Sequence, residues 1–78
     1  MIIFYFSPNV DWDTIKTTFG FTIDDIENLT YKNCIDLQKF AFKEWGGEIL
    51  MFTPETFAIL FNDGSISDEG YIKIFSNN

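Results

Sequence analysis

The segment that most constrains the fold is the run of residues 30–45, TYKNCIDLQKFAFKEW, whose apolar positions recur with the period of a helix. With about 100° between successive residues, its polar side chains fall into one narrow stripe, formed by Lys32, Asp36, Lys39 and Lys43. The rest of its surface is largely apolar and carries Cys34, Ile35, Leu37, Phe40, Ala41, Phe42 and Trp45. A surface helix usually buries a stripe only slightly wider than ~100°. We therefore expect cover on two sides, from a sheet of the same chain and from either another helix or another chain.

Three short segments are expected to form strands. Residues 2–6, IIFYF, are β-branched or aromatic throughout and predict a buried strand. Residues 48–52, EILMF, follow a pair of glycines, and residues 71–75, YIKIF, alternate between the two faces of a strand. The first and last of these segments are the most apolar, so we expect them to pair at the centre of the sheet.

Four helices are expected around these strands, over residues 11–19, 22–28, 30–45 and 53–62. Thr22 and Asp25 have the spacing of a capping box at a helix start. Thr53 is a suitable N-cap residue, and Pro54 fits the first turn, where its missing N–H costs nothing. Gly20 is expected to end the first helix in a left-handed conformation.

The order of these elements predicts a single α+β domain over residues 1–78, with a sheet of two or three strands packed against three or four helices on one face. A chain of 78 residues has a core close to the minimum for independent folding. Domains of this size usually gain stability from disulfides, metals or self-association. Cys34 is the only cysteine, whereas fifteen residues are aromatic, which is a large number to bury in so small a core.

The acidic loop within residues 61–75, FNDGSISDEGYIKIF, has part of the pattern of a calcium-binding loop. When Gly70 takes the sixth position, Ser76 falls at the twelfth, where a bidentate glutamate is needed. We therefore expect a structural loop and no metal site. Gly64 is predicted to end a helix, Ser67 and Asp68 to form a turn, and Gly70 to adopt an unusual backbone conformation.

Catalytic chemistry finds little support in the sequence. The chain has no histidine to activate Cys34 or a serine, and Cys34 lies on the apolar side of its helix. The neighbouring carboxylates at 11/13, 24/25 and 68/69 are better explained by helix capping and the helix dipole. We expect no enzyme activity and no cofactor.

The net charge of −7 restricts the classes of partner. The five lysines are scattered and arginine is absent, so there is no basic surface for direct nucleic-acid or anionic membrane binding. No segment approaches the ~20 apolar residues of a membrane span, and the apolar start lacks the features of a signal peptide. With one unpaired thiol, a cytoplasmic location is expected.

The leading functional expectation is a non-catalytic protein–protein interaction module that forms a homodimer. Self-association would cover the surplus aromatic surface, through either the second side of the helix over residues 30–45 or an exposed edge strand. The candidate interface residues are Trp12, Ile35, Phe40, Phe42 and Trp45.

The alternative is an acidic inhibitor that blocks a basic partner surface, as immunity proteins, antitoxins and phage-type nucleic-acid mimics do. The acidic charge and the electrostatic steering that it provides support this class. The candidate partner-binding residues are Asp24, Asp25, Glu27, Asp63, Asp68 and Glu69. This alternative requires that these six carboxylates share one face.

Overall fold

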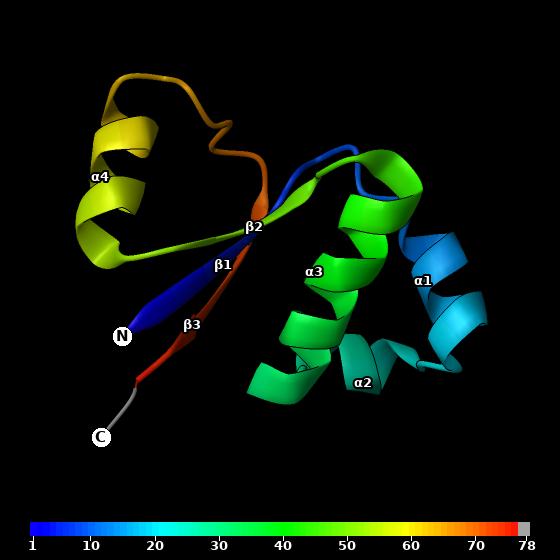
Figure 1. Cartoon of the computed structure of the whole chain (residues 1–78). Coiled ribbons are helices and arrows are strands. Elements are labelled where there is room, and N and C mark those ends of the chain that lie inside the picture. The colour runs from blue at the N-terminus through cyan, green and yellow to red at the C-terminus, as the bar shows by residue number, and fades with distance from the viewer. Residues whose placement is uncertain (77–78) are drawn as a thin grey trace.

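The computed structural model describes residues 1–76, which form a three-stranded antiparallel sheet and four helices (Figure 1). The elements in chain order are β1 (Ile2–Phe6), α1 (Trp12–Phe19), α2 (Ile23–Glu27), α3 (Tyr31–Trp45), β2 (Ile49–Phe52), α4 (Pro54–Asn62) and β3 (Tyr71–Phe75). The predicted α+β class is confirmed, and every predicted helix and strand agrees with the observed bounds to within one residue.

The strand order is β2-β1-β3, with both pairs antiparallel. The predicted pairing of the first and last strands is confirmed, but only β1 is central and β3 lies at an edge. This difference follows from composition. β1 has no charged residue and four of its five residues are buried, whereas β3 carries Lys73 and leaves Ile74 exposed.

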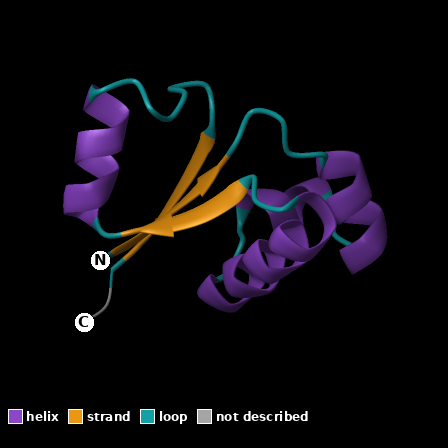
Figure 2. Ribbon diagram, turned by 45° about the horizontal axis from the view of Figure 1, so that its top comes forward, coloured by secondary structure: helices purple, strands orange, loops and turns teal. Residues whose placement is uncertain are grey.

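Helices cover both faces of the sheet, so the expectation of helices on one face is wrong (Figure 2). Helices α1 to α3 lie on the face of Phe4, whose ring contacts that of Tyr31 in α3. Helix α4 lies on the opposite face, where the ring of Phe57 contacts that of Phe52 in β2. Because β1 is apolar at every position, the side chains on both of its faces are stabilised by burial. A single layer of helices would leave one of these faces exposed to water.

Helix α3 is covered on two sides, as predicted, and a second helix of the same chain supplies much of that cover. Its residues Cys34, Leu37 and Ala41 are buried in the core. On its other side, the ring of Phe40 meets that of Phe19 of α1 edge to face, with 5.3 Å between the ring centroids.

Gly64 ends helix α4 as predicted. Its φ is +79°, a conformation that other residues adopt only with strain. The Gly64 N–H donates to the carbonyl of Phe61, and the Ser65 N–H donates to the carbonyl of Leu60, at N···O distances of 3.3 and 2.9 Å. These two bonds form a Schellman motif.

Gly70 does not adopt an unusual backbone conformation, so that prediction is wrong; the reason for glycine here is close packing. A Cβ at this position would overlap the ring of Tyr5, lying 2.5 Å from its Cζ and 2.6 Å from its hydroxyl oxygen. The Tyr5 hydroxyl donates a 2.8 Å hydrogen bond to the carbonyl of Ser67. The predicted turn at Ser67 and Asp68 is therefore held against the sheet by β1.

Candidate functional site

Of the five residues expected at an interface, the structure leaves Phe42 at the surface, with 72% of its area exposed. The other four, Trp12, Ile35, Phe40 and Trp45, are half-buried and pack against the core of their own chain. Trp12 stacks on Phe6, and Trp45 meets Phe40 edge to face, with centroid distances of 5.2 and 5.5 Å. Phe42 thus differs from the rest, because most of its surface is exposed and, among the described residues, it does not belong to those packed against the core.

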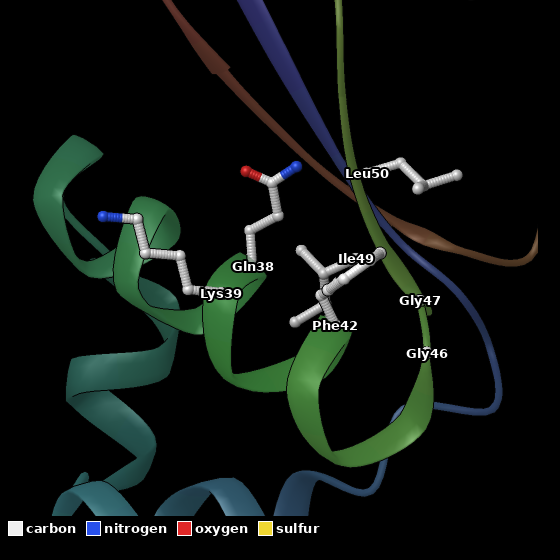
Figure 3. A pocket seen from close by; sticks show the side chains of 7 residues that line it. All are labelled: Gln38, Lys39, Phe42, Gly46, Gly47, Ile49 and Leu50. Carbon is white, nitrogen blue, oxygen red and sulfur yellow. The ribbon is translucent and has the colours of Figure 1, made fainter.

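Phe42 lines a groove of about 430 Å³ beside the free edge of β2 (Figure 3). The lining residues are Gln38, Lys39, Phe42, Gly46, Gly47, Ile49 and Leu50. Gly46 and Gly47 form the turn from α3 to β2, and their lack of side chains keeps this end of the groove open. Ile49 faces the helix, whereas Leu50 points to the other side of the strand.

Strand β2 adds two further exposed apolar side chains, Leu50 at 40% and Met51 at 42% exposure. We name the three residues Phe42, Leu50 and Met51 the β2-edge surface. A strand was predicted here, but Leu50 and Met51 were not among the predicted interface residues. The available signal was a charge-free run, ILMF, which follows two glycines and Glu48.

The main chain of β2 is also open along this edge. Among residues 1–76, the only strand that pairs with β2 is β1. The Ser7 N–H donates to the carbonyl of Glu48 at 2.8 Å, which extends the β1–β2 register beyond Ile49 by one bonded pair. Bonded and non-bonded pairs alternate along an antiparallel ladder. The N–H and C=O groups of Ile49 and Met51 therefore point away from β1, toward the free edge.

The two edges of the sheet differ in their protection against a further strand. At the β3 edge, Lys73 pairs with Phe4, so the lysine lies on the face of the sheet that α1 to α3 cover, near Cys34. An inward-pointing charge at an edge opposes pairing with another chain. Strand β2 has no charge and no proline between Ile49 and Phe52. It is the unprotected edge.

Charge is distributed unevenly around these edges. Residues 31–52, which contain α3 and β2, carry three lysines and three carboxylates and so have no net charge. The rest of the chain carries two lysines and nine carboxylates, which account for the whole net charge of −7. The β2-edge surface therefore lies in the neutral part of an acidic protein.

The six acidic candidates do not share one face. Asp24, Asp25 and Glu27 belong to α2, on the side of the sheet that α3 covers, whereas Asp63, Asp68 and Glu69 belong to the loop after α4 on the opposite side (Figures 1 and 2). Two of them hold backbone turns. Asp25 accepts a 2.8 Å hydrogen bond from the Thr22 N–H in a capping box. Hydrogen bonds from the hydroxyl and the backbone N–H of Ser65 lower the pKa of Asp63.

Cys34 is fully buried in the core cluster. Burial raises the pKa of its thiol to about 11, an effect that the nearby Lys73 ammonium only partly opposes. The thiol is therefore protonated at neutral pH and is a poor nucleophile. Within residues 1–76, no three cysteine or carboxylate side chains are grouped in a way that could hold a metal ion.

Comparison with known proteins gives no family for this chain, because no family model, curated protein or solved structure matches it. Function is therefore inferred from the chemistry of its surface. In the part of the chain that the structure describes, every helix is too short or too polar to cross a bilayer.

Proposed function

We propose that this chain is a non-catalytic protein–protein interaction module that forms a homodimer through the β2-edge surface. The observation that carries the proposal is the coincidence of three exposed apolar side chains with an unprotected strand edge. A strand edge supplies main-chain hydrogen bonds to a partner, and adjacent apolar side chains supply the burial that stabilises the contact.

Phe42 is expected to contribute most to this contact. Covering an exposed phenylalanine side chain stabilises a complex by about 1.5–3 kcal/mol through removal of apolar area from water. Phe42 is the most exposed of the large apolar side chains that the structure describes. An aromatic ring beside an open groove has the character of an interface hot spot.

The charge distribution favours a second copy as the partner. A basic protein would be attracted to the acidic regions formed by α2 and the loop after α4, because those regions carry the excess negative charge. The neutral β2-edge surface offers it no such attraction. Two copies of this chain can approach through that surface with little like-charge repulsion.

The chemical state of Cys34 supports a role without catalysis. Cys34 is buried and protonated, and no histidine exists to act as a general base. A single unpaired thiol also fits a reducing cytoplasm, where we propose that the protein resides.

Sedimentation velocity at micromolar concentrations tests the proposal. The wild-type chain, of 9.1 kDa, is expected to sediment with twice this mass. Replacement of Phe42 by serine is expected to weaken the dimer at least tenfold, which corresponds to about 1.4 kcal/mol of lost binding free energy. The matched control is Ile59→Ser, because Ile59 is 64% exposed on α4, on the other side of the sheet. A wild-type monomer, or a dimer lost in Ile59→Ser and kept in Phe42→Ser, would refute the proposal.

A further inference from the structure

We infer that the two copies join strand β2 to strand β2 in antiparallel orientation, around a two-fold axis at Leu50, so that the two sheets become one sheet of six strands. This inference rests on the proposed self-association and adds its register. A two-fold interface is self-complementary. A residue on the axis contacts its own counterpart, and any other residue i that contacts residue j of the partner copy has a symmetry-related contact between j and residue i of the partner copy.

The register follows from the direction of the free main-chain groups. Ile49 and Met51 both point their N–H and C=O groups to the free edge, and Leu50 lies between them. When Leu50 of the two copies face each other, Ile49 lies opposite Met51 of the partner copy on both sides of the axis. Each of these two pairs exchanges two hydrogen bonds, as bonded pairs do in an antiparallel ladder. The N–H and C=O groups of Ile49 and Met51, four in each strand, then all have hydrogen-bond partners.

The same register covers the exposed side chains of the β2-edge surface. Phe42 and Ile49 both line the groove, Phe42 from α3 and Ile49 from β2. Ile49 is paired with Met51 of the partner copy in this register, so the exposed Phe42 ring meets the exposed Met51 side chain across the interface. On the opposite face of the sheet, Leu50 meets its counterpart. One contact therefore buries all three apolar side chains at once.

Helix α3 leaves room for this arrangement. The ring of Tyr31, at its N-terminal end, lies over Phe4 and Phe75, which belong to β1 and β3. Near the C-terminal end, Ile49 of β2 is buried beside the helix, whereas Met51 on the same face stays 42% exposed. The helix thus crosses the sheet obliquely, and the uncovered part of β2 is available to Phe42 of the partner copy.

A cysteine cross-link tests the register. In the non-bonded pair at the axis, the Cα atoms of Leu50 and its counterpart are expected at ~4.5 Å, and a disulfide spans about 4.4–6.8 Å. Air oxidation of Leu50→Cys, in which two thiols lose their hydrogens to oxygen, is therefore expected to give a covalent dimer in high yield. The wild-type chain is the blank, because its only thiol is buried.

Two matched variants identify other arrangements. Met51→Cys has the same strand and nearly the same exposure, but its two copies lie on either side of the axis and are not expected to cross-link. Ile74→Cys places the thiol on β3, at the other edge of the sheet. Cross-linking of Met51→Cys or Ile74→Cys in preference to Leu50→Cys would overturn the inferred register or edge while leaving self-association intact. A chain that sediments as a monomer would contradict both the inferred register and the proposed self-association.

Discussion

Replacement of Phe4 by alanine is expected to lower the free energy of unfolding by about 3–5 kcal/mol, the range for loss of a buried phenylalanine. Phe4 is fully buried on the central strand. Its ring meets those of Tyr31 and Phe75 edge to face, with centroid distances of 5.8 and 5.9 Å. A small domain has a total stability of about 5–15 kcal/mol, so this loss removes a large share of it. Urea unfolding followed by circular dichroism measures the change.

The matched control is the same substitution at Phe42, where the ring is 72% exposed. Both variants are compared with wild type in dilute protein, because self-association would otherwise add to apparent stability. Phe42→Ala is expected to change the free energy of unfolding by less than about 1 kcal/mol. Equal losses in the two variants would show that the sheet is not centred on β1 as described.

Replacement of Gly70 by alanine is expected to destabilise the fold by about 2–4 kcal/mol through overpacking and a lost hydrogen bond. The added Cβ overlaps the buried ring of Tyr5, which has to move. The hydrogen bond from the Tyr5 hydroxyl to the Ser67 carbonyl is then lost. Thermal unfolding measures the effect as a lowered midpoint.

Gly47→Ala is the control for this variant, because nothing lies within 4 Å of the position that its Cβ would take and its φ is not positive. It is expected to change stability by less than about 1 kcal/mol. The double variant Tyr5→Leu/Gly70→Ala is expected to lose less stability than the two single variants combined, because leucine leaves space for the Cβ. Strict additivity in this pair would contradict the proposed overlap.

The bounds of the helices and strands were predictable because they depend on local chemistry. Thr30 and Thr53 accept hydrogen bonds from the first turns of α3 and α4, and Gly46 ends α3 with a left-handed φ of +73°. These signals involve residues a few positions apart, so the sequence displays them directly. The same is true of Gly64.

The layer arrangement was not predictable in this way. The position of α4 depends on which face of β1 is left open by α1 to α3, and this is a property of the whole chain. The role of Gly70 likewise depends on Tyr5, which is far away in sequence. The prediction explained Gly70 by its own backbone conformation, whereas glycine is needed there because the ring of Tyr5 packs against it.

The candidate site was predicted in part for a related reason. Phe42 was predicted at an interface from the helical pattern, but so were Trp12 and Phe40, which pack within the chain. Distinguishing them requires the positions of α1 and the sheet. Leu50 and Met51 gain significance only when β2 is known to be an edge strand, and strand order is not encoded in the alternation of one strand.

Amide hydrogen exchange tests the proposed dimer most directly, because it reports on individual N–H groups. The N–H groups of Ile49 and Met51 point to the free edge of β2. By the same alternation, Phe4 is bonded to Lys73, so the N–H groups of Ile72 and Ile74 point to the free edge of β3. In the monomer both pairs point to a free edge, whereas the proposed dimer covers only the pair on β2.

Exchange is therefore followed by NMR over a series of protein concentrations. The dimer predicts that exchange at Ile49 and Met51 becomes at least tenfold slower than at Ile72 and Ile74 as concentration rises, and that dilution removes the difference. Rapid exchange at all four positions, at concentrations where the chain sediments as a dimer, would contradict pairing through β2.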